Sequence, residues 1–257
     1  MAGKVVATLV LLCGCYASRT DMRAAAGKVK NTDEVKQAAA DFQSDIEGMK
    51  KVLADFQDLR LTHTLADADD WIFSVAWAPD GRLAAGSRDK NVRVYDEDLR
   101  LTQTLGDADD PIESVAWAPD GRLAAGSRDK KVRVYDEDLR LTHTLDDADA
   151  WIFSVAWAPD GRLAAGGNDK KVRVYDKDLR LTHTLGDADR LVSSVAWTPD
   201  GRLAAGSYDK KVRVYDKDLR LIYTLGDADA WIFSVAWAPD GRLAAGSDDK
   251  KVRVYHK

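Results

Sequence analysis

Short apolar runs recur along most of this chain, and the whole pattern of runs returns every forty residues. Short runs that are β-branched, aromatic or apolar on alternate positions are typical of strands. Between the second and third runs lies Pro79-Asp80-Gly81, in which Pro fixes φ and Gly supplies the positive φ that a tight hairpin needs. Each copy therefore predicts one four-stranded antiparallel sheet. In the first copy its strands are Leu59–Leu65, Ile72–Ala78, Leu83–Ser87 and Val92–Tyr95.

Five copies follow one another in register, beginning at Asp58, Asp98, Asp138, Asp178 and Asp218. A single sheet with apolar residues on both faces cannot bury itself, so the copies must stack, and stacking around an axis gives a β-propeller. The fold class is thus all-β, a propeller of five blades spanning residues 58–257. The first strand has no blade in front of it, and the last copy lacks an outer strand. We expect Leu59–Leu65 to pair with Val252–Tyr255 and close the ring. The alternative is an incomplete array that closes only by joining another chain.

The repeat resembles the WD40 family. The resemblance rests on Ser74–Ser87, which reads SVAWAPDGRLAAGS, followed by Asp89 and by Val92–Asp96, and it recurs in all five copies. It implies a propeller that works as a protein-interaction platform.

This chain departs from the WD40 pattern at three places. Asp67-Ala68 stands where the family has Gly-His, Tyr95-Asp96 stands for Trp-Asp, and Ala85 replaces the strand Ser. Of the family's Asp-His-Ser-Trp hydrogen-bond chain only Asp89 remains, with Tyr95 in the Trp position. We expect the fold to survive and each blade to be somewhat less rigid.

Residues 1–17 have the proportions of a secretory signal, with one Lys, an apolar run at Val5–Leu12 and small residues at Cys15 and Ala17. Leu12-Cys13-Gly14-Cys15 also resembles a bacterial lipobox, which would make Cys15 a lipid anchor. The alternative is an apolar tail without a targeting role. The protein is expected to be secreted or membrane-anchored if residues 1–17 are a working signal, and cytoplasmic otherwise. Membrane attachment is expected only if this segment is a lipid anchor.

Residues 18–57 contain a predicted amphipathic helix from Asn31 to Gln57. Its apolar positions are spaced by four and three residues over three heptads: Val35, Ala39, Phe42, Ile46, Met49, Leu53 and Phe56. Such a helix either packs on the propeller flank or forms a coiled coil with a second chain, which would make residues 31–57 a self-association segment.

The composition excludes several function classes. The net charge of −5 argues against a nucleic-acid binder, which would carry a basic stripe. None of the phosphate-binding, zinc-protease or nucleophile-elbow motifs occurs, so we expect no enzyme activity, no catalytic residues and no cofactor. His63, His143 and His183 take one position in different blades and cannot converge on a metal. The Asp-Ala-Asp loops lack the ligand spacing of calcium loops.

Function must arise where the copies differ, because shared positions serve folding. Three variable offsets match the positions that face the entry side of WD40-like propellers. By copy they read Trp71, Phe73 and Arg88; Pro111, Glu113 and Arg128; Trp151, Phe153 and Asn168; Leu191, Ser193 and Tyr208; Trp231, Phe233 and Asp248. Aromatic residues gathered on one face are the usual anchors of protein recognition.

Acidic loops of the type Asp67-Ala68-Asp69 recur in every copy beside these aromatic positions, with Asp70, Asp110 and Asp146 adding to them. Aromatic anchors rimmed by carboxylates suit a Lys/Arg-rich peptide. The alternative is that the Asp residues only form turns and keep the protein soluble. A second function is a secreted lectin-like propeller in which each Trp stacks on a sugar, although the second and fourth copies lack that Trp.

Overall fold

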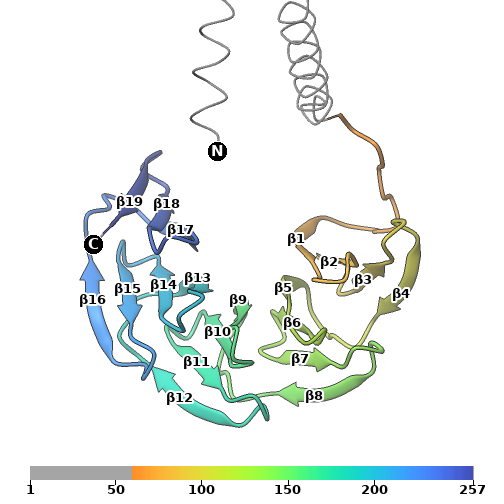
Figure 1. Ribbon diagram of the computed structural model, residues 1–257, viewed down its shortest axis with the longest axis horizontal. Helices are drawn as coiled ribbons and strands as arrows, with labels where there is room; N and C mark the ends of the chain where they lie inside the picture. Colours follow the sequence, from red (N-terminus) through yellow and green to blue (C-terminus); the bar gives the residue numbers. More distant parts are fainter. Residues whose placement is uncertain (1–59, 257) are drawn as a thin grey trace, which may run out of the picture. The chain divides into compact units, whose positions relative to one another are not determined.

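The computed structural model describes residues 60–256, and in them nineteen strands form five antiparallel sheets (Figure 1). The strands of the first two blades are β1 (Ile72–Trp77), β2 (Leu83–Ser87), β3 (Val92–Tyr95) and β4 (Leu101–Leu105), then β5 (Ile112–Trp117), β6 (Leu123–Ser127), β7 (Val132–Tyr135) and β8 (Leu141–Leu145). The third and fourth blades contain β9 (Ile152–Trp157), β10 (Leu163–Gly167), β11 (Val172–Tyr175) and β12 (Leu181–Leu185), then β13 (Val192–Trp197), β14 (Leu203–Ser207), β15 (Val212–Tyr215) and β16 (Leu221–Leu225). The fifth contains β17 (Ile232–Trp237), β18 (Leu243–Ser247) and β19 (Val252–Tyr255). The predicted five-bladed all-β fold is confirmed.

In each blade the strands lie side by side in chain order, from β1 on the inside to β4 on the outside in the first blade (Figure 1). The inner strands contact one another in sequence, β1 with β5, β5 with β9, β9 with β13 and β13 with β17. The outer strand comes from the following copy of the repeat, since β4 is the Leu-Thr-x-Thr-Leu run that begins the second copy. This shared strand ties consecutive blades together.

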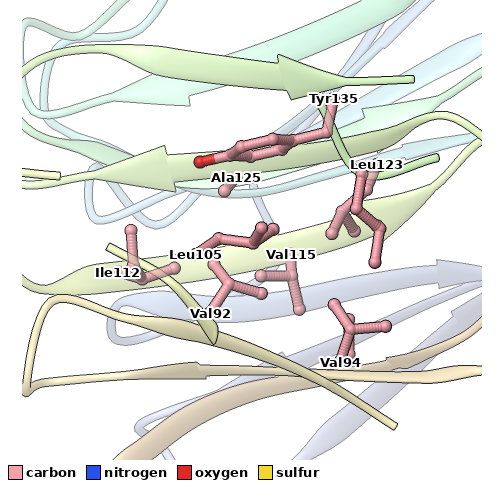
Figure 2. Packing of buried hydrophobic residues seen from close by; sticks show 10 residues of the cluster. Val92, Val94, Leu105, Ile112, Val115, Leu123, Ala125 and Tyr135 are labelled. Carbon is pink, nitrogen blue, oxygen red and sulfur yellow. The ribbon is translucent and has the colours of Figure 1, made fainter. Parts of the chain in front are cut away.

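Each blade packs onto the next through a contact between a glycine and a branched side chain. Ile112 and Val115 of the second blade lie against Val92 and Val94 of the first, and all four are buried (Figure 2). Gly86 lets them approach, because a Cβ there would lie 2.6 Å from Ile112 Cγ2. The contact recurs at the other three junctions, where the glycine meets Ile152, Val192 and Ile232.

Most polar contacts at the junctions also recur from blade to blade. The Val115 amide donates to Ser74 Oγ of the preceding blade at 3.1 Å. At the last three junctions the Trp indole donates to an alanine carbonyl, as Trp157 Nε1 does to Ala116 O at 3.2 Å. An arginine of the preceding blade covers the Trp ring at all four, as Arg82 does Trp117 at 4.6 Å. The serine bond and the arginine–tryptophan contact thus recur at all four junctions, whereas Trp117 Nε1 at the first junction has no hydrogen-bond partner among the described residues.

The pairing expected to close the ring is not formed in the part of the chain that the structure describes. Sheet β17–β18–β19 has three strands, and residues 60–70 contain no strand. All five sheets lie in one unit, in which the first and last blades stand at the two ends of an open arc (Figure 1). Val75 and Val254 are exposed, whereas their equivalents Val115 and Val94 are buried. The physical reason is the angle between neighbouring blades. The packing at each junction sets this angle, and five blades at this angle do not complete the ring.

The predicted turn chemistry is confirmed at the Pro-Asp-Gly hairpins. Gly81 has a φ of 90°, and its amide donates to Ala78 O at 3.1 Å. Two further turns place larger residues in the left-handed region, with Lys90 at 75° and Leu99 at 61°, and both recur in the later blades. No pattern in the sequence indicated these two positions, because neither residue type favours positive φ.

The expected signal or anchor at residues 1–17 and the whole of the segment 18–57 lie outside the described residues. Within residues 60–256, no helix is long and apolar enough to cross a membrane.

Replacing Gly126 by Ala tests the junction contact. The new Cβ would lie 2.6 Å from Ile152 Cγ2 and 3.1 Å from Val155 Cγ1, so the free energy of unfolding should fall by about 1–3 kcal/mol, as for other overpacked cores. The matched control is Gly186→Ala, because a Cβ at Gly186 has no atom within 4 Å. Urea unfolding of both variants measures the difference, and equal stabilities would contradict the junction contact as the constraint.

Candidate functional site

A buried ion pair supports the edge of each blade where the variable residues lie. In the second blade, Arg133 Nη1 lies 2.7 Å from Asp129 Oδ2, and both side chains are buried. Equivalent pairs join Arg93 to Asp89, Arg173 to Asp169, Arg213 to Asp209 and Arg253 to Asp249. Burial alone would raise the pKa of Asp89, but hydrogen bonds from the Asp69 and Asn91 amides and from Arg93 outweigh it and hold that pKa below its usual value. The charged carboxylate is thus the stable form in the folded blade.

The arginine of this pair was not identified from the sequence, where only Asp89 was retained from the family's hydrogen-bond chain, with Tyr95 in the Trp position. The available signal was Arg93 itself, a charged residue four positions after the Asp in an otherwise apolar strand. The Tyr hydroxyl has a different partner, the first Asp of the acidic loop. Tyr135 Oη donates to Asp107 Oδ2 at 3.0 Å, and Tyr215 Oη to Asp187 Oδ2 at 2.9 Å.

Burial, and then the neighbouring Asp67, raises the pKa of Tyr95 to about 12. The same two causes, with the equivalent loop Asp, raise the pKa of Tyr135, Tyr175 and Tyr215 still further. These hydroxyls therefore stay protonated and hold the loops in place.

The second Asp of each acidic loop also contacts its own blade. The Asp109 amide donates to Asp129 at 3.0 Å, and the Asp109 carboxylate lies 3.6 Å from Lys131 Nζ. The later loops repeat the ion pair between Asp149 and Lys171, Asp189 and Lys211, and Asp229 and Lys251. The bond from Tyr135 of β7 to Asp107 places this loop over the third strand of its sheet. The loops lie beside the turns that carry Arg88 and its equivalents, and much of their charge is already paired.

The three variable offsets meet at that same edge, over the inner strand of each blade. The Arg88 amide donates to Trp71 O at 2.8 Å, which joins the turn after β2 to the residue before β1. The equivalent bonds run from Arg128 to Pro111, Asn168 to Trp151, Tyr208 to Leu191 and Asp248 to Trp231. The backbone thus places the first and third variable positions of each blade together.

Over the first three blades, the protein's own arginines cover the aromatic rings. The Arg128 guanidinium lies 5.3 Å from the Phe73 ring and 4.9 Å from the Trp151 ring, and it forms an ion pair with Glu113. Arg88 lies 5.1 Å from the ring of Trp71, which is 67% exposed. Three blades are linked side chain to side chain in this way. Phe153 contacts Trp151 edge-on at 6.2 Å, and Asn168 is exposed.

Over the last two blades the aromatic residues form a cluster of their own, Tyr208, Trp231 and Phe233. The Tyr208 and Trp231 rings stack at 4.7 Å and 7°, and the Phe233 ring meets Tyr208 edge-on at 5.5 Å. Burial raises the pKa of Tyr208, and the charges of Asp248 and Glu113 raise it further. No arginine of residues 60–256 lies over Trp231 or Phe233, so this cluster combines open aromatic surface with a nearby carboxylate.

The fourth blade contributes little open surface besides Tyr208. Ser193 Oγ donates to Ile232 O of the next blade at 2.6 Å, so this hydroxyl joins two blades. A shallow hollow at the opposite edge of the blades, lined by Pro159, Asp160, Arg162, Pro199 and Asp200, includes none of the variable residues. Among the described residues, no three His, Cys, Asp or Glu side chains are arranged to hold a metal ion.

Alkaline unfolding tests the Tyr–Asp bonds. An exposed Tyr has a pKa of about 10, so the neutral folded Tyr contributes stability that is fully present below that pH. The stability is lost as the pH rises through the folded value, about 12 for Tyr95. The melting temperature followed by circular dichroism should stay level from neutral pH to about 9 and fall above about 10. Tyr135→Phe should lower stability at pH 7 by about 0.5–1.5 kcal/mol and make the alkaline fall shallower. An identical alkaline fall in the variant would contradict the assignment.

Comparison with known proteins places the repeat in a family. The WD domain, G-beta repeat family matches residues 59–96, 99–136, 139–176, 179–216 and 219–256, which together make up most of the chain. No curated protein matches the sequence at a significant level. A chain in the crystal structure of a mitotic checkpoint complex is similar in fold, with a TM-score of 0.69 and 22% identity, over 75% of this chain and 63% of that one. This protein therefore belongs to the WD40 repeat family.

Proposed function

We propose that this protein is a non-catalytic interaction scaffold that binds a partner protein through the edge formed by its variable residues. The observation that carries the proposal is the exposure of Trp71, Trp151, Trp231 and Phe233 at this one edge, each more than 40% exposed. Large aromatic side chains are costly to leave in water, and they supply much of the binding energy in protein interfaces. The WD40 fold supports a scaffold in general, and these residues define the surface.

The edge divides into two halves that suit different groups on a partner. Over the first three blades, Arg88 and Arg128 already take the cation positions on Trp71, Phe73 and Trp151. Over the last two blades, no arginine of residues 60–256 covers Trp231 or Phe233, and Asp248 begins the turn beside Trp231. A Lys or Arg of the partner would stack there and meet a carboxylate, a contact worth about 0.5–2 kcal/mol. The basic peptide is therefore assigned to the half formed by the fourth and fifth blades.

A lectin is the second candidate function, because an exposed Trp also stacks on sugars. The second and fourth blades have Pro111 and Leu191 at the Trp position, so the edge lacks one sugar platform per blade. This uneven distribution of the Trp residues favours the protein partner.

Selection of a displayed random peptide library on the full-length chain tests the proposal. The enriched peptides should contain Lys or Arg, and Trp231→Ala should weaken their binding about tenfold or more, as expected for a hot-spot aromatic residue. Tyr223→Ala is the matched control, because Tyr223 is an exposed aromatic residue on the outer strand β16. It should leave binding within about twofold.

Three outcomes would contradict the proposal. They are the absence of any enriched peptide, equal losses in the two variants, and a strong hit on a glycan array that depends on Trp231. The last would favour the lectin.

A further inference from the structure

The outward face of the last blade keeps every feature by which the other blades receive a neighbour. Val252 and Val254 of β19 are 72% and 61% exposed, whereas Val92 and Val94, their equivalents in the first blade, are 1% and 0% exposed. A Cβ at Gly246 would have no atom within 4 Å. At the four equivalent glycines the next blade's Ile or Val lies within 2.7 Å of that position. Among residues 60–256, no blade lies against this receiving surface.

The outward face of the first blade has the complementary features. Val75 and Trp77 of β1 are 63% and 62% exposed, whereas Val115, the equivalent of Val75, is 5% exposed. At each junction within the chain these positions insert into the preceding blade. The two end faces are therefore the two halves of the same junction that the chain builds four times.

Polar groups at the ends match in the same way. Ser234 Oγ and Ala236 O occupy the positions of Ser74 and Ala116, which accept hydrogen bonds from the next blade. Arg242 occupies the position of the arginines that cover a Trp ring. Its side chain is 54% exposed, against 21% for Arg202, which lies over Trp237. The first blade carries the matching groups for these three contacts. The Val75 amide matches Ser234, the Trp77 indole N–H matches the Ala236 carbonyl, and the Trp77 ring matches Arg242.

We propose that the last blade of one chain binds the first blade of a second copy, head to tail, through a fifth junction identical to the four within the chain. Self-closure would place the same residues together, but it requires all four existing junctions to change their angle, and those junctions are close-packed. A second copy needs no such change. The contact joins two different faces, so it is heterologous and grows into rings or open chains.

Two variants of the full-length chain, each blocked at one end, test the proposal. Gly246→Val fills the space that the incoming Ile72 would occupy, and Val75→Asp places a charge on the inserting face. Val75 and Gly246 have open space around them in the single chain, so both variants should fold normally. Gly186→Val is the control, because a Cβ at Gly186 also meets no atom within 4 Å and the residue lies in the loop between β12 and β13.

Sedimentation velocity gives the masses. Wild type and Gly186→Val should grow heavier with rising concentration, and each blocked variant should form no end-to-end species alone. An equal mixture of Val75→Asp and Gly246→Val should double in mass and stop there, because only one open pair of faces remains.

Two results would overturn the proposal. A wild-type monomer at every concentration would mean that the chain covers its own ends. A mixture no heavier than its separate components would mean that any self-association uses another surface, such as the heptad segment at residues 31–57.

Discussion

A glycine facing a branched side chain is the contact on which the rest of this structure depends. Gly86 and its equivalents have no Cβ, and this absence lets the next blade's side chain reach the preceding sheet. Those side chains are Ile112, Ile152, Val192 and Ile232. Burying one such side chain contributes about 1.5–3 kcal/mol, and each blade has no other way to cover its apolar face. The contact also sets the distance and angle between blades. The hydrogen bonds and the arginine–tryptophan contacts then follow at fixed positions.

Variation is confined to an edge that this shared packing does not use. Positions that face the neighbouring blade are almost the same in every copy, while residues just before the inner strand and after the second strand differ. The five sets of variable side chains are nevertheless not independent. Arg128 lies between Phe73 and Trp151 of the neighbouring blades, and Tyr208 stacks on Trp231 of the next one. The surface that each blade presents at this edge therefore depends on the variable residues of its neighbour, and a substitution in one blade alters the surface of the next.

Most of the fold could be predicted from the sequence, because strands and turns depend on local patterns that the repeat shows five times. The run at Ile72–Ala78 appears as β1, Ile72–Trp77, and Gly81 takes the predicted positive φ. Whether the ring closes could not be predicted, because closure depends on the angle between blades. That angle is set by side-chain packing and cannot be read from a hydrophobic pattern. The grouping of Trp71, Phe73 and Arg88 was predictable from variation between copies. The covering of aromatic rings by Arg88 and Arg128 was not, since it depends on side-chain direction across blades.

The outer strand of each blade is supplied by the next copy of the repeat, and this has a consequence for how the chain reaches its fold. The run that forms β8 is nearly identical to those that form β4 and β12, so β3, β7 and β11 offer almost the same partner to each. Pairing energy then hardly distinguishes the correct match from one that skips a blade. The correct match is favoured chiefly by the shorter loop it closes, an entropic preference of only about 0.6 kcal/mol for each doubling of loop length. Sequence identity between repeats thus makes the blades interchangeable when folded and raises the chance of kinetic traps during folding.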